Sequence, residues 1–260
     1  MRINKVFPFL VLLLVASISI TACSPKASPD QPSLPPAEQP TELPTENPFN
    51  PAILGDCYNP FFPVMEGKVW KYAVVSGGVS STLEVSYKDV TPSFFTSVQQ
   101  FPDIRTEIQW SCGPDGMLSS QLANMSIAQI PDIKYEIVEM KGVLFPKEDK
   151  WQVGNSWGTS YVIKIEYTSG ETVLEGQGNI EISNTIAAVE PITVLSGTYN
   201  DAFRVDTSGT IIINISGMGT DISMPITNTT WHVKDVGLVK SISANPSLTY
   251  SSSMELASLE

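Results

Sequence analysis

The sequence has little of what several common classes of protein require. Its 260 residues include one histidine and three cysteines, and 15 basic residues stand against 27 acidic ones, a net charge of −12. One histidine leaves little with which to build a histidine-based metal centre. The acidic balance argues against a protein that binds a nucleic-acid backbone. Three cysteines are too few for a small disulfide-dense scaffold. With 42% hydrophobic residues, however, the chain is too apolar to be disordered throughout.

Residues 1–22 are typical of a secretory signal peptide. Arg2 and Lys5 precede an apolar run of about 15 residues, shorter than the roughly 20 that a permanent membrane helix needs. The segment 20–23, Ile-Thr-Ala-Cys, then resembles the bacterial lipobox. The resemblance implies cleavage before Cys23 and attachment of lipid to its thiol, and two or three acyl chains such as palmitate anchor a protein stably. The alternatives are an ordinary signal peptide with a chance cysteine, or a single transmembrane anchor.

A proline-rich tether is predicted for residues 23–56, beginning at the lipidated Cys23. Residues 24–56 contain nine of the 20 prolines, with mostly polar residues between them. Such a composition cannot bury enough apolar surface to offset the entropy lost on ordering. Proline also favours an extended chain of about 3.1 Å per residue, so the segment could span roughly 100 Å. The alternative, a proline-rich recognition ligand, lacks a repeated PxxP core with basic neighbours.

Residues 57–260 are predicted to form an all-β domain. Apolar residues alternate with polar ones over runs of strand length, rich in Ile, Val, Thr, Tyr and Trp, and Gly, Pro, Asn or Asp separate the runs. We expect a curled antiparallel sheet or half-barrel of about ten to twelve strands, with at most one or two short helices. The best helix candidate is 119–130. The alternating runs are 69–74, 83–87, 104–110, 133–137, 161–167, 210–216 and 222–233, and the alternation slips at Val138 and Glu139.

A short internal repeat suggests two similar sub-units, 57–145 and 146–260. Gly67 and Gly154 each stand three residues before a tryptophan that leads into a predicted strand, at Trp70 and Trp157. A glycine turn followed by a strand-initiating aromatic residue is an economical way to begin a sheet layer. A chance match of so short a motif is the alternative.

Three segments together resemble a group of uncharacterised bacterial lipoproteins. They are 57–72, with G-x-x-W-x-Y, 196–205, with G-T-Y-x-D-A-F-x-V, and 231–240, with W-x-x-x-x-x-G-L-V-K. The resemblance implies a curved antiparallel sheet akin to the half-barrel carriers of lipid and lipoprotein, and it implies no chemistry. Gly197 and Gly237 are expected in turns of positive φ, and Trp231 is expected to anchor the core.

Cys57 and Cys112 remain once Cys23 is assigned to lipid. An oxidising, exported location favours a disulfide between them. The alternatives are two free thiols, or a metal pair, which would need more soft ligands than the chain offers.

One sequence motif matches the pattern of a serine hydrolase active site. Residues 154–158 match the G-x-S-x-G nucleophile elbow, and Ser156, Asp201 or Asp206, and His232 follow the order of a hydrolase triad. The elbow requires a helix after the serine, whereas the residues that follow Ser156 alternate like a strand. A glycine-flanked turn before a strand is therefore the favoured interpretation.

Paired carboxylates offer a second, weaker catalytic pattern. Glu148 with Asp149, or Glu136 with Glu139, could supply a glycosidase-like acid and base. With 27 acidic residues in the chain, some such pairing is inevitable, and solvated surface is the favoured interpretation.

The sequence therefore predicts a lipid-anchored, non-catalytic β domain outside the cytoplasm, on the cell membrane or an outer membrane. We expect it to bind an apolar ligand or an envelope component, in a concavity for which aromatic residues are candidates: Phe94, Phe95, Trp110 and Trp151. Plain core positions are the favoured interpretation of these four residues, so no ligand-binding residue is assigned. The alternatives are a structural or protein-interaction lipoprotein without a cavity and, third, a serine hydrolase using Ser156. No cofactor, metal or nucleic-acid partner is predicted.

Overall fold

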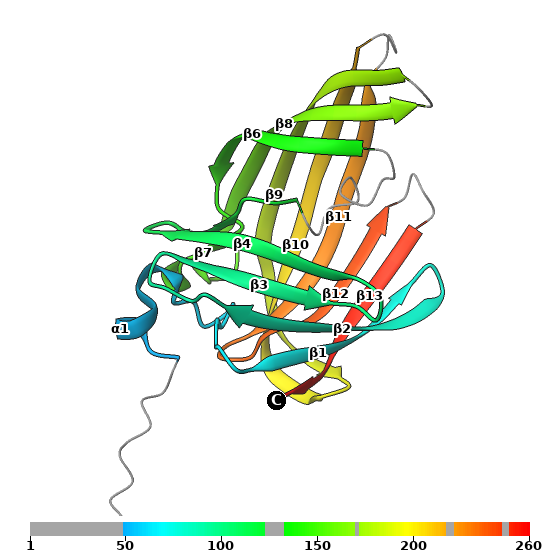
Figure 1. Ribbon diagram of the computed structural model, residues 1–260. Helices are drawn as coiled ribbons and strands as arrows, with labels where there is room; N and C mark the ends of the chain where they lie inside the picture. Colours follow the sequence, from blue (N-terminus) through cyan, green and yellow to red (C-terminus); the bar gives the residue numbers. More distant parts are fainter. Residues whose placement is uncertain (1–48, 123–132, 170–171, 217–220, 246–249) are drawn as a thin grey trace, which may run out of the picture. The chain divides into compact units, whose positions relative to one another are not determined.

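The computed structural model describes residues 49–122, 133–169, 172–216, 221–245 and 250–260 (Figure 1). Within these ranges there is one short α-helix, α1 (Pro51–Leu54), and there are two 3-10 turns (Gly55–Cys57 and Glu148–Lys150). None of the helices described is long and apolar enough to cross a membrane. The strands are β1 (Val69–Ser76), β2 (Val79–Lys88), β3 (Phe94–Gln100), β4 (Arg105–Gly113), β5 (Gly116–Ser119), β6 (Ile133–Gly142), β7 (Phe145–Pro146), β8 (Ser156–Ser169), β9 (Thr172–Val194), β10 (Gly197–Ile215), β11 (Ile222–Val233), β12 (Gly237–Asn245) and β13 (Tyr250–Leu259).

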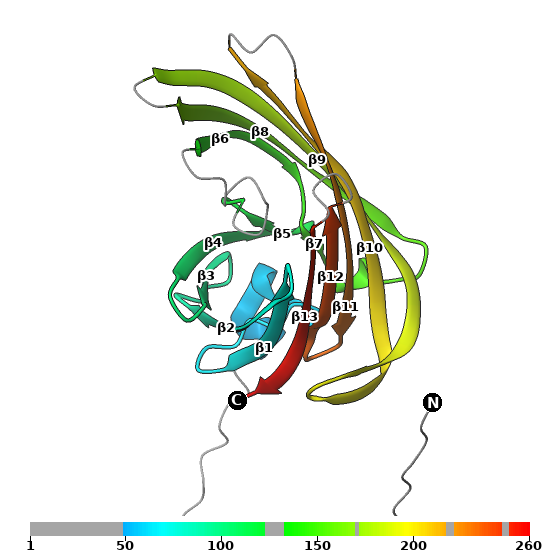
Figure 2. The same ribbon diagram turned by 90° about the vertical axis from the view of Figure 1, so that its right-hand side faces the viewer.

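All described strands belong to one antiparallel sheet. Its order is β6-β8-β9-β10-β11-β12-β13-β1-β2-β3-β4-β5-β7, so β6 and β7 are its two ends and the sheet is not closed. The first and last strands of the chain, β1 and β13, lie side by side in its middle. Figure 2 shows β6, β8, β9 and β10 arching away from the more tightly curled part formed by β1–β5. The all-β, curled-sheet prediction is confirmed.

Alternating burial along β8, β9 and β10 explains why these residues form strands. In β8, Tyr161, Ile163 and Ile165 are buried, while Lys164 and Glu166, which each follow a buried isoleucine, are exposed. One face of each strand is thus removed from water and the other is solvated, as in most antiparallel sheets.

The slip in alternation near Val138 corresponds to a bulge in the edge strand. The pairing of β6 with β8 shifts register between Ile137 and Glu139, which leaves Val138 unpaired and exposed. A bulge adds one residue on one strand and reverses the face of every residue beyond it. Met140 and Gly142 therefore share a face with Ile137.

The curled part of the sheet encloses an aromatic core, which we define as Phe61, Phe62, Phe145, Trp151 and His232. Phe61 stacks on Trp151, with ring centroids 4.2 Å apart, and Phe62 lies 4.4 Å from Phe145. The ring of His232 lies 5.7 Å from Phe145 and 5.3 Å from Trp151. Segments before β1 and around β7 thus supply the filling of this part of the sheet.

Residues 49–56, which the sequence analysis assigns to the tether, are folded. Asn50 caps α1 by accepting a hydrogen bond from the backbone N–H of Ala52, and Pro51 occupies the first helical position. Leu54 is buried, and Asp56 accepts a hydrogen bond from Lys147 at 3.0 Å. Local capping and contacts with the sheet therefore order a segment whose composition alone predicts an extended chain.

The glycines of the two similar motifs occupy equivalent turns. Gly67 (φ 78°) and Gly154 (φ 90°) each precede a strand, β1 and β8. Gly197 (φ 141°) and Gly237 (φ 88°) have positive φ as well, as predicted. The expected sub-unit boundary falls in β7, and strands from both predicted sub-units belong to the same sheet.

The helix candidate 119–130 is described only at its start. Ser119 is the last residue of β5, and residues 123–132 lie outside the described residues.

Candidate functional site

The arching part of the sheet carries a continuous apolar surface, which we call the isoleucine face. Residues that pair directly across antiparallel strands lie on the same face of a sheet, so the register defines its members. Four rows run from β6 to β10 or β11. They are Tyr135, Ile165, Gly176 and Ile215; Ile137, Ile163, Gly178, Ile213 and Ile222; Met140, Tyr161, Ile180, Ile211 and Met224; and Gly142, Thr159, Ile182, Gly209 and Ile226.

No charged side chain belongs to these four rows. The isoleucines at the centre of the face, Ile163, Ile180 and Ile211, are almost completely buried. Leu118 and Leu122, from β5 and the residues after it, pack against this cluster. The members at the margin, among them Tyr135 and Met224, are only partly buried.

Tyr161 differs from the isoleucines at the centre of the face because it carries a hydroxyl group. It is 1% exposed, and its hydroxyl is buried with no hydrogen-bond partner among the described residues. Burial raises the pKa of this phenol above its ordinary value, so that it stays protonated and remains a donor. Buried hydroxyls are nearly always hydrogen-bonded, so this one is unusual.

A polar row separates the isoleucine face from the aromatic core. Its members pair directly across five strands: Asn184, Thr207, Asn228, Ser243 and Ser252. The hydroxyl of Thr207 donates to Asn184 Oδ1 at 2.7 Å, and Ser243 donates to Asn228 Oδ1 at 3.0 Å. The row divides the apolar interior into two regions.

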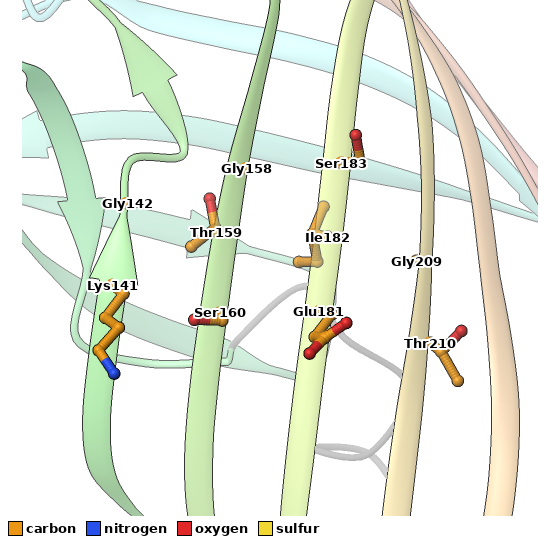
Figure 3. A pocket seen from close by; sticks show the side chains of 10 residues that line it. All are labelled: Lys141, Gly142, Gly158, Thr159, Ser160, Glu181, Ile182, Ser183, Gly209 and Thr210. Atoms are coloured by element: carbon orange, nitrogen blue, oxygen red, sulfur yellow. The ribbon is translucent and has the colours of Figure 1, made fainter.

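A shallow hollow of about 420 Å³ lies at β6 and β8–β10 (Figure 3). Lys141, Ser160, Glu181 and Thr210 line it in one row across β6, β8, β9 and β10. One row of the isoleucine face, Gly142, Thr159, Ile182 and Gly209, lines it as well. Lys141 forms an ion pair with Glu139 at 2.7 Å, which is solvent-exposed. Exposed ion pairs contribute little to stability, and Ile182, which is 9% exposed, is the one large apolar side chain among the residues that line the hollow.

A second hollow, of about 630 Å³, lies beside β3 and β4. Phe94, which is 49% exposed, lines it together with Trp110. The other aromatic candidates for a concavity are packed: Phe95 stacks on Trp110 at 5.7 Å, and Trp151 belongs to the aromatic core.

Ser156 is not assembled into a catalytic triad among the described residues. Its hydroxyl lies 2.8 Å from Thr185 Oγ1, and β8 begins at Ser156 where an elbow would require a helix. His232 is 3% exposed, and its ring nitrogens lie 3.2 Å from the carbonyl oxygen of Phe61 and 3.1 Å from Thr230 Oγ1. Asp206 accepts instead from the hydroxyl of Thr229 at 3.2 Å.

The carboxylate pairs named from the sequence are distributed over the surface. Glu148 accepts a hydrogen bond from Lys234 at 2.7 Å, Asp149 pairs with Lys150 at 3.2 Å, and Glu139 pairs with Lys141. In the described part of the chain, no group of three or more His, Cys, Asp and Glu side chains could hold a metal ion.

The cysteines fall into two groups. Cys23 lies outside the described residues. Cys57 and Cys112 form a disulfide with a Cα–Cα distance of 5.1 Å, which joins the start of the domain to β4. Cys57 is fully buried beside Val64 and Met117, so the bridge belongs to the core and not to a reactive surface.

Sequence analysis did not identify Tyr161 or the isoleucine face as a site. The alternation of β8 indicates that Tyr161 is buried, but only the pairing of β6 with β8 to β11 shows which residues share its surroundings.

Comparison with known proteins shows the fold alone. Neither a family model nor a curated protein matches the sequence. Two solved structures are similar, one named "putative exported protein with YMCC-like fold", from Bacteroides fragilis, and one named "putative lipoprotein", from Parabacteroides distasonis. The first is 13% identical in sequence, with a TM-score of 0.50, and the match covers 77% of this chain and 98% of that protein's chain. The second is 18% identical, with a TM-score of 0.51, and the match covers 78% of this chain and 99% of that protein's chain.

Proposed function

We propose that this protein is an exported lipoprotein, anchored through lipid on Cys23, whose β domain binds an apolar ligand on the isoleucine face. The observation that carries the proposal is the composition of that face, which joins four rows of uncharged side chains across β6 and β8–β11. A large apolar surface at one end of an open sheet is suited to an acyl chain, which needs contact area and no charge.

The two apolar regions of the sheet are filled differently. The aromatic core is filled by large rings from the residues before β1 and around β7. On the isoleucine face, the described residues that pack from outside β6 and β8–β11 are Leu118, in β5, and Leu122, after it. Large rings thus fill the aromatic core, whereas the isoleucine face is lined mainly by aliphatic side chains, with Tyr135 and Tyr161 among them. Aliphatic side chains suit flexible alkyl chains.

The anchor is supported by the sequence of the first 23 residues and by the names of the two similar structures. The basic start, the short apolar run and the Ile-Thr-Ala-Cys segment match a lipoprotein signal. The similar structures carry the words "exported" and "lipoprotein" in their names. Fractionation of the membranes distinguishes attachment to the outer face of the cell membrane from attachment to an outer membrane.

A non-catalytic role is part of the proposal. The hydroxyl of Ser156 lies within hydrogen-bond distance of Thr185, and the ring nitrogens of His232 are bonded to Phe61 and Thr230.

Mass spectrometry of the full chain, produced in a bacterium and purified from its membranes, tests both parts. We expect the mature mass to begin at Cys23 with diacylglycerol and acyl additions, and the Cys23→Ala variant to lack both the cleavage and the additions. Extraction of the same sample should release apolar molecules in a fixed ratio to protein. An unmodified Cys23 contradicts the anchor, and protein that binds no apolar molecule contradicts the ligand.

The second candidate is a lipoprotein that interacts with proteins and holds no ligand. The burial of Ile163, Ile180 and Ile211 favours it, because a filled interior needs no further occupant. In that case the extraction above yields no bound lipid, while crosslinking in intact cells captures a protein partner.

A further inference from the structure

The hydroxyl of Tyr161 lacks the partner that its surroundings require. It is buried within the isoleucine face and has no hydrogen-bond partner among the described residues. A donor removed from water without an acceptor costs free energy, so such groups persist where something else supplies the acceptor. The neighbours of Tyr161 in its row, Met140, Ile180 and Ile211, have no oxygen in their side chains.

Tyr161 lies one strand in from the edge of the sheet, and its side chain is buried there. Its partner on one side is Met140 of β6, an end strand, and Met140 is 36% exposed. On the other side, Ile180, Ile211 and then Met224 continue the row across β9, β10 and β11. Because these side chains are packed together, a chain-like molecule that enters at this edge has to displace Met140 and the residues packed on the face, and it then meets Tyr161 first and the isoleucines next.

The electrostatics of the face restrict what the acceptor can be. No cationic side chain belongs to its four rows, so a carboxylate placed against Tyr161 would be buried without a counter-charge. Burying an unpaired charge costs far more than one hydrogen bond returns. Burial also keeps the phenol protonated, because it raises the pKa of Tyr161. The acceptor that fits is a neutral carbonyl.

We propose that the ligand of the isoleucine face is a neutral acyl ester, whose carbonyl oxygen accepts a hydrogen bond from the Tyr161 hydroxyl while its alkyl chain lies along the isoleucines. This inference rests on the proposed function and specifies its ligand class. Free fatty acids, ionised at neutral pH, bind this face less well than esters of the same chain.

The test uses the full chain in liposomes with three photoactivatable probes that share one alkyl chain: a monoacylglycerol, the corresponding free fatty acid and the corresponding alkane. Crosslinked peptides are mapped by mass spectrometry, and affinities are measured by competition with the unlabelled compounds at pH 7.5. Tyr161→Phe removes only the hydroxyl. Tyr167→Phe is the matched control, because Tyr167 packs against the same cluster from the same strand.

We expect the monoacylglycerol to crosslink to β8–β10 and to bind more tightly than the fatty acid. Loss of one neutral hydrogen bond should weaken its binding roughly five-fold in Tyr161→Phe, leave alkane binding unchanged, and leave Tyr167→Phe like the parent. The melting temperature of Tyr161→Phe should equal or exceed that of the parent, which shows that the variant folds.

Two outcomes overturn the inference while leaving the proposed function intact: tighter binding of the fatty acid than of the ester, or an ester affinity that Tyr161→Phe leaves unchanged, as a buried water would produce. Absence of all three probes from the isoleucine face overturns the proposed function as well.

Discussion

Acidification should destabilise the fold through its one histidine. His232 is 3% exposed and lies between the rings of Phe145 and Trp151. The carbonyl oxygen of Phe61 can only accept a hydrogen bond, so Nδ1 carries the proton and Nε2 accepts from the hydroxyl of Thr230. The folded protein therefore holds a neutral imidazole with both nitrogens bonded.

The size of the effect follows from the pKa of the imidazole. Burial lowers the pKa of His232 from its ordinary 6.5 to about 4, and the hydrogen bond to Phe61 opposes this shift. Between pH 6.5 and pH 4 the unfolded chain binds a proton that the folded protein does not. The free energy of unfolding therefore falls as pH is lowered through this window and levels off below it. A difference of about 2.5 pKa units corresponds to about 3 kcal/mol.

Urea denaturation at several pH values between 7.5 and 4, followed by tryptophan fluorescence, measures this loss. His232→Asn is the matched variant, because its amide can still donate toward the Phe61 carbonyl but does not titrate in this range. At pH 7.5 the variant should be less stable than the parent, since it loses ring contacts. The difference should shrink or reverse by pH 4, and contributions from carboxylates cancel in the comparison.

Parallel stability curves for the parent and His232→Asn would refute the reasoning. A direct check is the NMR titration of the imidazole, which needs no assignment because the chain has a single histidine. An imidazole pKa near 6.5 in the folded protein would contradict the burial on which the prediction depends.

Three further predictions concern the core and the decoy motif. The double variant Cys57→Ala/Cys112→Ala should lose up to about 4 kcal/mol of stability, as expected for the bridge that spans 55 residues in sequence, and dithiothreitol should then have no additional effect on urea denaturation. Gly178→Ala should lower the free energy of unfolding by about 1–3 kcal/mol, because an added Cβ would lie 2.7 Å from a neighbouring isoleucine side chain, whereas Gly158→Ala, with its nearest contact at 3.4 Å, should cost much less. Ser156 should not react with a fluorophosphonate probe, since its hydroxyl is bonded within the sheet, and labelling that Ser156→Ala abolishes would restore the hydrolase hypothesis.

The fold class could be predicted because alternation is a local property of the chain. The runs 69–74 and 161–167 contain their own evidence for strands, and the slip at Val138 even locates the bulge of β6. Turns of positive φ at Gly197 and Gly237 were equally predictable, since glycine adopts such angles without the penalty that a Cβ brings.

The contacts within the aromatic core could not be predicted in the same way. Phe61 and Phe62 are adjacent in the sequence, but their neighbours Phe145, Trp151 and His232 lie 83 or more positions further along the chain. Contacts at such separations follow from the curvature of the whole sheet. Likewise, alternation along the chain does not show which strands are neighbours or which strand lies at the edge. The isoleucine face follows from the order of β6, β8 and β9 in the sheet.

Two buried polar groups, the imidazole of His232 and the hydroxyl of Tyr161, differ in whether the described residues provide their hydrogen-bond partners. His232, in the aromatic core, has a hydrogen bond at each ring nitrogen, so the fold itself satisfies it. Tyr161, beyond the polar row, has none for its hydroxyl among the described residues. If Tyr161 served only packing, phenylalanine at this position would fill the same space without the cost of an unpaired donor. The hydroxyl is therefore explained best by an acceptor that the chain itself does not provide, which is why a variant that loses only this oxygen separates a packed core from a binding site.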